Sequence, residues 1–364
     1  MQFRGGSSKG LFFQAADLPT DAPERNRLIL AAMEGVGCGD PRQIDGLGGA
    51  TSLTSKVAIV GRSAPAGSGS PPADLDYLFL QVVVGAGRVS TDQTCGNLLA
   101  AVLPFAIESG LLPAGGPTTT ARINMVNTGG ICEVTVQTPG GVTEYAGSAA
   151  VGYAKVDGVP GTGAPILCHY LDIAGSTCGT LLPTGQTRDR VAGVEVTCLD
   201  NGMPEIVIRA ADVGLTGYES PAELEANEPL KHTLEHIRLA AGLLMNLGDV
   251  TTKTVPKLCL IAPPRAGGLV STRTFIPHRV HEAIGVLGAI STATACLLPG
   301  SVADGIAVLP EDSESGYSVE HPTGEFTVRL EQSNTQGARQ IGKSGVVRTA
   351  RLLSRGEVLL PVVD

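Results

Sequence analysis

The run Cys95-Gly96-Asn97-Leu98-Leu99-Ala100-Ala101-Val102 and its continuation to Leu112 decide the fold of this chain. Because the run is apolar on every side, it predicts a helix buried at the centre of a domain. A second run of the same kind starts at Ile284-Gly285-Val286 and continues to Leu298. We therefore expect two similar halves, each built around one apolar helix. Because only the first helix begins with a cysteine, we expect the halves to differ in their chemistry.

Short stretches rich in valine, isoleucine and threonine predict strands on both sides of these helices. They are residues 56–60, 78–84, 121–126, 131–136, 194–199, 205–210, 257–262, 325–330 and 346–353. Two more helices are expected at 24–33 and at about 221–244. The second is amphipathic, and its charged residues are expected on a solvated face: Glu223, Glu225, Lys231, Glu235 and Arg238. Residues 61–72 and 311–316 are expected to form surface loops.

The order of these elements predicts two strand-rich domains, each wrapped around one apolar helix. The polar stretch 184–190 is the expected seam between them. It gives a first domain of residues 1–186 with its helix at 95–112, and a second domain of residues 187–346 with its helix at 284–298. The C-terminal strand at about 347–364 is a candidate to return to the first domain.

The composition limits the partners of the protein. The net charge is −9, aromatic residues make up 4%, and tryptophan is absent. Such a chain, without a basic cluster, is not typical of nucleic-acid binding, and no apolar run reaches the length of a membrane span. The 8 cysteines form no CxxC pair, and the polar start is not a signal peptide, so we expect a cytoplasmic protein with reduced thiols. His278 and His281 lack a third ligand at metal spacing, so no metal site is expected.

Cys95 is the first candidate for chemistry. It follows Asp92-Gln93-Thr94 at the start of a predicted helix, and helix N-termini stabilise thiolates. A cysteine taken at random is more often structural, but Gly96 and Asn97 make this helix start open to a ligand, which favours function. The other cysteines are expected to be structural: Cys38, Cys132, Cys168, Cys178, Cys198, Cys259 and Cys296.

Lys56 is the second candidate, and its sequence context leaves two interpretations open. A lysine between a turn and a strand is usually a solvated surface group. The upstream run Gln43–Ala50, however, is rich in glycine and contains only one charged residue, Asp45. A lysine buried among such residues can lose its proton near neutral pH and serve as a base.

Two other stretches are candidates to bind an anion. Residues Arg4–Gly10 form a glycine- and hydroxyl-rich loop whose N–H groups could hold a carboxylate or phosphate, although the loop lacks the spacing of a P-loop. Residues Arg273–His281 contain two arginines just before the second apolar helix, and arginine binds carboxylates through paired hydrogen bonds. The alternatives are an ordinary turn and a solvated loop.

Four of these segments carry a resemblance to a known family: Arg4–Gly10, Gln43–Ile59, Gln93–Asn97 and Val196–Pro204. Over nearly its whole length the chain resembles the PrpF family of the diaminopimelate epimerase superfamily. The resemblance implies an α+β, diaminopimelate epimerase-like fold of two similar domains, each a β-barrel-like sheet around a central apolar helix, with the active site in the cleft between them. It also implies that no cofactor is used. Cys95 matches the first of the two cysteines of the epimerases, Ile284 replaces the second, and Lys56 matches the lysine used by PrpF-type isomerases.

Residues 246–250, 272–297, 319–328 and 347–353 look most like family members that act on 4-oxalomesaconate. The resemblance therefore implies a cofactor-independent isomerase that shifts a proton in this tricarboxylate, by tautomerisation or 1,3-allylic isomerisation, during bacterial catabolism of gallate and lignin-derived aromatics. Lys56 and Cys95 are the catalytic candidates. The substrate-binding candidates are Ser7, Ser8, Ser52, Thr54, Gly96, Asn97, Met203, Arg273, His278, Arg279, Gly285 and Val286.

Several alternatives stay open at this point. One is an aconitate or methylaconitate isomerase of the PrpF type, and another is a non-catalytic protein that binds a tricarboxylate. A racemase is disfavoured because Ile284 stands where the second cysteine would be. A homodimer is one of the oligomeric states that the sequence leaves open.

Overall fold

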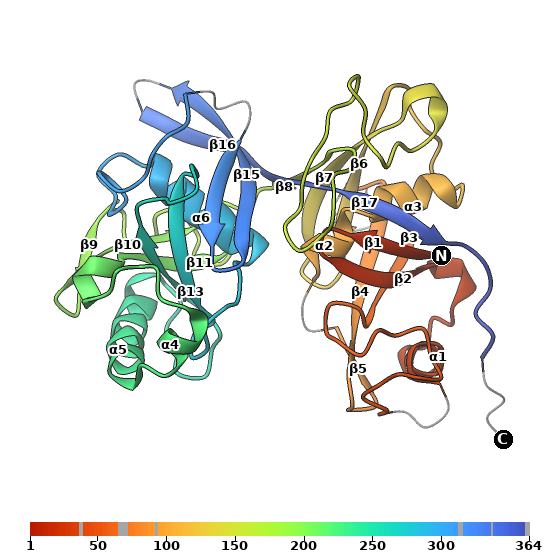
Figure 1. Cartoon of the computed structure of the whole chain (residues 1–364), viewed down its shortest axis with the longest axis horizontal. Coiled ribbons are helices and arrows are strands. Elements are labelled where there is room, and N and C mark those ends of the chain that lie inside the picture. Colours follow the sequence, from red (N-terminus) through yellow and green to blue (C-terminus); the bar gives the residue numbers. More distant parts are fainter. Residues whose placement is uncertain (36–38, 65–71, 92–93, 312–315, 336–337, 361–364) are drawn as a thin grey trace. The chain divides into compact units, whose positions relative to one another are not determined.

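The computed structural model describes residues 1–35, 39–64, 72–91, 94–311, 316–335 and 338–360 (Figure 1). Contacts divide the chain into two compact units: unit 1 is Met1–Leu171 with Val347–Asp364, and unit 2 is Asp172–Val346. Cys38, Asp92, Gln93 and the centres of the two expected surface loops lie outside the described residues. No helix among the described residues is long and apolar enough to cross a membrane.

Unit 1 is a mixed sheet around a broken helix. Its strands are β1 (Gln2–Gly5), β2 (Ser8–Gln14), β3 (Lys56–Arg62), β4 (Leu75–Val83), β5 (Arg88–Ser90), β6 (Thr118–Met125), β7 (Gly130–Gln137), β8 (Ile166–Leu171) and β17 (Ala350–Ser354). They pair in the order β17-β1-β2-β3-β4-β6-β7-β8, and β5 adds to β4. Strand β16 (Ala338–Arg348) also pairs with β8, and it precedes β17 by one residue.

The helices of unit 1 cover the two faces of this sheet. Helices α2 (Gly96–Leu99) and α3 (Val102–Glu108) contact β1, β2, β3 and β7, and the rings of Phe3, Phe12 and Phe105 pack together there. Helix α1 (Ala22–Glu34) buries Ile29 and Met33 against the opposite faces of β2, β3 and β4. The short 3-10 turns Ala15–Asp17 and Pro139–Gly141 complete the unit.

Unit 2 has the same construction. Its strands are β9 (Asp189–Val191), β10 (Val194–Asp200), β11 (Pro204–Arg209), β12 (Lys257–Ala262), β13 (Val270–Phe275), β14 (Tyr317–His321), β15 (Gly324–Thr335) and most of β16. Helix α6 (Val286–Leu297) contacts β10, β11, β14 and β15 and is buried over most of its length. The 3-10 turn Ala210–Val213 and helices α4 (Pro221–Glu225) and α5 (Glu228–Leu244) follow β11, and α5 packs on the other face of the sheet.

The pairing order repeats from one unit to the other. From β1 to β8 and from β10 to β16, successive pairs are antiparallel, parallel, antiparallel, parallel, antiparallel and antiparallel. In both units, the chain between the two strands of the first parallel pair forms a 3-10 turn and then an outer helical segment, α1 in unit 1 and α4 with α5 in unit 2. The chain between the two strands of the second parallel pair contains the apolar helix. This order is the structural counterpart of the repeat seen in the sequence.

The first apolar helix is shorter than the sequence predicts. Instead of one helix over 95–112, the structure has α2 and α3, which meet at Ala100 and Ala101, and α3 ends at Glu108. Pro104 has no N–H to donate to the carbonyl of Ala100, which breaks the continuous hydrogen-bond ladder. The helix expected at 221–244 is likewise two helices, because Asn227 caps a new helix through Leu230 N.

Two further expectations are corrected. The units divide after Leu171 and not at 186. The segment that follows Leu171 is held by Asp200 of unit 2: the backbone carbonyl of Asp200 accepts from Gly175 N, and its side-chain Oδ2 accepts from Thr177 N and Cys178 N. Arg238 was expected on a solvated face, but its side chain is fully buried. It donates to the carbonyls of Val250, Lys253 and Val255, which makes a buried guanidinium tolerable.

Candidate active site

The hairpin between β1 and β2 lies against the start of α2. Gly6 has a φ of 51°, and Asn97 Nδ2 donates a 3.2 Å hydrogen bond to Ser7 Oγ. A Cβ on Gly6 would lie 2.1 Å from Asn97 Oδ1, and one on Gly5 would lie 2.5 Å from Asn97 O. The glycines are therefore needed for this close approach, and they bring Ser7, Ser8 and Asn97 together at one place.

Cys95 is the N-cap residue of α2 and is half-buried. Its Sγ lies 4.0 Å from Ser8 Oγ, and its carbonyl accepts a 3.2 Å hydrogen bond from the hydroxyl of Tyr77. Burial raises the pKa of Tyr77 well above its usual range, so this phenol remains a neutral donor. Because α2 has only 4 residues, its dipole is weak. Cys95 thus contacts Ser8 and Tyr77, and it begins a short helix in place of the long one expected from the sequence.

Lys56 is the first residue of β3, and only 7% of it is exposed. The sequence left open whether Lys56 is a solvated surface group or a buried one, and in the structure its side chain is buried. Its Nζ donates a 2.7 Å hydrogen bond to Gln81 Oε1 and lies 5.0 Å from the centre of the Phe79 ring. Among the residues that the structure describes, no carboxylate forms an ion pair with Lys56. A buried amine without a counter-ion is the setting that a lysine base requires.

The glycine-rich loop before β3 is held by side chains of its own. Gln43 Oε1 accepts from Ser55 Oγ at 2.6 Å and from Ala50 N at 2.8 Å. A Cβ on Gly48 would lie 2.1 Å from the same oxygen, which explains the glycine there. Thr54 Oγ1 is within 2.8 Å of Thr51 Oγ1. Ser52 and Thr54 thus belong to the ordered loop that leads into Lys56, and Ser52 is exposed.

The candidates in unit 2 have different surroundings. Arg273 lies in the buried strand β13, where its Nε donates to Glu219 O and its Nη1 donates to Thr272 O at 2.7 Å. The alternative of a solvated loop therefore does not hold for Arg273, two of whose donors are used by backbone carbonyls, while its assignment to a substrate carboxylate stays a prediction. His278 is exposed and lies 3.7 Å from Glu235 Oε2. Arg279 is exposed.

The start of α6 gathers the remaining candidates. Gly285 is its N-cap residue, Val286 is its first helical residue, and the space where a Cβ of Gly285 would lie is open. Ser291 Oγ donates a 2.8 Å hydrogen bond to the carbonyl of Met203, which ties the β10–β11 turn to the helix. Beneath α6, Thr292 Oγ1 donates to Glu205 Oε2 at 2.8 Å, and burial raises the pKa of Glu205 to about 8.

Two residues beside the catalytic candidates were missed by the sequence analysis, namely Gln81 and Tyr77. Both lie in β4 and point to the same side as Phe79, because alternate residues of a strand share a face. A lone glutamine within the apolar run Leu78–Val84 is the signal that could have identified Gln81, since an unpaired amide is costly in a buried strand.

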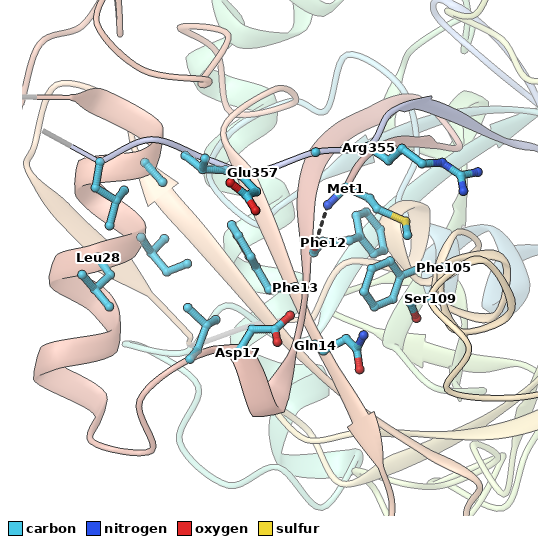
Figure 2. Close-up of a pocket in the computed structure, with 16 residues that line it drawn as sticks. Met1, Phe12, Phe13, Gln14, Asp17, Leu28, Phe105, Ser109, Arg355 and Glu357 are labelled. Carbon is cyan, nitrogen blue, oxygen red and sulfur yellow. Dashed lines mark hydrogen bonds between the residues drawn. The ribbon is translucent and has the colours of Figure 1, made fainter.

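A pocket of about 440 Å³ in unit 1 is lined by other residues (Figure 2). Phe12 and Phe13 of β2 face it together with Phe105 of α3, and Arg355 and Glu357 belong to the C-terminal segment beside it. None of its described lining residues is a candidate from the sequence. The described residues also contain no group of three acidic, histidine or cysteine side chains arranged to hold a metal ion.

Comparisons with known proteins agree with one another. The model of the PrpF protein family matches residues 1–361. The chain is 54% identical over 360 residues to a (4E)-oxalomesaconate Delta-isomerase of Novosphingobium sp., covering 99% of this chain and 96% of the relative. It is 52% identical over 359 residues to a 4-oxalomesaconate tautomerase of Pseudomonas putida, covering 98% and 94%. The crystal structure of a methylitaconate-delta-isomerase is similar, with a TM-score of 0.82, 30% identity, and 98% and 93% coverage.

Proposed function

The chain belongs to the PrpF family, and from that premise we propose that it is an isomerase of 4-oxalomesaconate. The observation that carries the proposal is the 54% and 52% identity, over nearly the full length of both partners, to two enzymes named for this substrate. The methylitaconate-delta-isomerase, at 30% identity, supports the broader class of isomerases.

The proposed reaction is a proton shift in an unsaturated keto-tricarboxylate. A hydrogen on carbon next to a conjugated enone is acidic, because the carbanion that remains is a dienolate. A neutral amine removes this proton, and a second group returns a proton to the other end of the conjugated system. Substrate and product have the same atoms and oxidation state, so the reaction consumes no co-reactant.

Lys56 and Cys95 are the residues that we assign to these two steps. What supports Lys56 is its burial without an ion-pair partner among the described residues, together with its hydrogen bond to a neutral amide. What supports Cys95 is its half-buried thiol beside Ser8 and the anchoring of its carbonyl by Tyr77. Ser7, Ser8 and Asn97, which meet at the hairpin, are the proposed contacts for a carboxylate in unit 1.

Proton NMR of the turnover in heavy water tests the proposal. Wild type is expected to convert 4-oxalomesaconate and to place solvent deuterium on the product carbon. Lys56→Met is expected to abolish both, whereas Lys257→Met, which removes a lysine at the corresponding strand start of unit 2, is the matched control. Full turnover by Lys56→Met would exclude Lys56 as the base.

The same assay examines Cys95 and the alternative functions. Cys95→Ser is expected to slow turnover and to change deuterium incorporation, and an unchanged rate and pattern would leave Cys95 with a packing role only. Faster turnover of aconitate, methylaconitate or methylitaconate than of 4-oxalomesaconate would identify a different substrate. Binding of a tricarboxylate without hydrogen exchange would identify a non-catalytic binding protein.

A further inference from the structure

Gln81 is the direct partner of Lys56 across two antiparallel strands. In the pairing of β3 with β4, Lys56 is opposite Gln81, so both side chains project from the same face of the sheet. Gln81 is 9% exposed and Lys56 is 7% exposed. The amide and the amine therefore meet in a largely dry environment, where a hydrogen bond has more effect than in water.

The orientation of the Gln81 amide is determined by its neighbours. Its Nε2 lies 2.9 Å from the carbonyl oxygen of Ser55, 3.1 Å from that of Val82 and 3.2 Å from that of Ser52. Carbonyl oxygens only accept hydrogen bonds, so the NH2 group must face them and Oε1 must face Lys56. The 2.7 Å contact between Oε1 and Lys56 Nζ is therefore one in which the lysine donates.

This arrangement constrains Lys56 without neutralising it. Whether it is an ammonium or an amine, Lys56 must direct one N–H to Oε1, and the Phe79 ring at 5.0 Å limits a second side. The lone pair of the neutral amine must then point away from Gln81. A carboxylate in the same place would also fix Nζ, but it would hold the proton on the nitrogen. An amide oxygen gives the same geometry with a much weaker preference for the charged form.

We propose that Gln81 is the positioning residue of the reaction: it directs the amine of Lys56 and, being uncharged, leaves that amine able to give up its proton. This inference rests on the proposed function only in assigning Lys56 as the base. The placement of the amine by Gln81 can be measured without any substrate.

The test follows the titration of the Lys56 amine by NMR, using labelled lysine and Lys56→Met to assign the resonance. Gln81→Glu is expected to move the midpoint upward by ~1–3 pH units, the usual effect of an opposite charge at this distance. Gln81→Met removes the acceptor and is expected to move it downward by about 0.7 unit, because a hydrogen bond to a charged donor is the stronger one. A purely structural role would not move the midpoint in opposite directions.

The chain offers a matched control in the same sheet. Gln14 is opposite Val60 in the pairing of β2 with β3, where Gly10 is opposite Lys56. Four residues along a strand place it ~13 Å from Lys56, which exceeds the screening length of about 10 Å at 0.1 M salt. Gln14→Glu therefore adds the same charge and is expected to leave the Lys56 midpoint unchanged.

Kinetics separate the two contributions of Gln81. Gln81→Glu is expected to shift the ascending limb of the kcat–pH profile to higher pH by the same amount as the NMR midpoint. Gln81→Met is expected to lower kcat more than it changes KM, although more of its lysine is neutral, because the amine is no longer directed.

The outcomes distinguish the inference from the proposed function. Midpoints of both Gln81 variants equal to that of wild type would overturn the inference, even if 4-oxalomesaconate is turned over. If the midpoints move apart but Lys56→Met retains turnover, the positioning by Gln81 stands and the base assignment fails. Should Gln81→Glu not fold, Gln81→Met alone decides, since an unchanged or raised midpoint contradicts the inference.

Discussion

Replacing Glu205 with glutamine tests how a buried carboxyl limits the stability of unit 2. Glu205 is fully buried between β11 and α6, and a Cβ on Gly288 of α6 would lie 3.3 Å from its Oε1. Burial raises its pKa from 4.5 to about 8, against the smaller opposing effects of Thr292 and Lys257. The folded protein therefore keeps this carboxyl protonated over a range of pH in which the unfolded chain ionises it.

The sign and size of the effect follow from these two pKa values. Because the folded pKa is the higher one, the contribution of Glu205 to stability is fully present below pH 4.5 and is lost as the pH rises towards 8. Each pH unit in this window costs about 1.4 kcal/mol. The loss is about 3 kcal/mol between pH ~5.5 and ~7.5, and it approaches about 5 kcal/mol above the folded pKa.

Urea unfolding at a series of pH values measures this dependence. Glutamine has the shape of glutamate but no charge, so Glu205→Gln is expected to unfold with nearly the wild-type free energy at pH ~5 and to be more stable by several kcal/mol at pH ~8. The exposed acid Glu357 supplies the control, and Glu357→Gln should follow the wild-type curve. Parallel pH curves for Glu205→Gln and wild type would refute the reasoning.

Three more substitutions have definite expected outcomes. Arg238→Met should lower the free energy of urea unfolding by about 3 kcal/mol, because it removes the hydrogen bonds to three backbone carbonyls and the ion pair with Glu235. Lys231→Met on the same helix should cost less than about 1 kcal/mol. Gly6→Ala should lower kcat/KM by roughly 100-fold, because the new Cβ would clash with Asn97. Gly129→Ala is the control: it has a similar positive φ but no atom within 4 Å of its Cβ, and it should leave kcat/KM unchanged. Lys257→Met should change the turnover rate by less than a factor of about three, because a side chain away from the chemistry has little effect on the transition state. A loss of turnover as large as that expected for Lys56→Met would contradict the assignment of the chemistry to unit 1.

The sequence predicted those elements whose burial leaves an apolar signature. Strand β12 has the predicted bounds, Lys257–Ala262, because both of its faces are covered and its residues are nearly all apolar. The hairpin β1–β2 was instead interpreted as a loop. Its residues include glycine, serine and lysine, and its outer partner, β17, begins at residue 350. Pairing over such a separation leaves no local pattern to recognise.

Polar residues that are satisfied inside the protein are the other source of error. All six residues of β13, Val270–Phe275, are buried although half of them are hydroxyl residues and one is Arg273. Thr272 Oγ1 donates to Glu320 O at 2.7 Å, and Arg273 donates to backbone carbonyls. Sequence composition gives the polarity of a side chain but not its partner, so the sequence predicts no strand at residues 270–275.

The residues of the candidate site also differ in whether the sequence alone could identify them. Cys95 and Lys56 could be identified from their positions at predicted element starts, together with the family resemblance. Gln81 could not, because its role depends on a cross-strand register and on three carbonyls from two segments. A single polar residue in an apolar strand indicates that a partner exists, but only the fold says which one.

The repeat gives two lysines the same position in the fold but different partners. Lys56 begins β3, which pairs in parallel with β2, and it is opposite Gly10. Lys257 begins β12, which pairs in parallel with β11, and it is opposite Glu205. In unit 1 a side chain is excluded at that position, because a Cβ on Gly10 would lie 2.5 Å from Lys56 O.

The equivalent position in unit 2 therefore has a different electrostatic environment. Burial lowers the pKa of Lys257, and the carboxyl of Glu205 partly opposes this shift. Lys257 is opposite the buried carboxyl of Glu205, whereas Lys56 faces a neutral amide and an aromatic ring. The same fold position thus carries the proposed base, Lys56, in one unit and a lysine opposite a buried acid in the other.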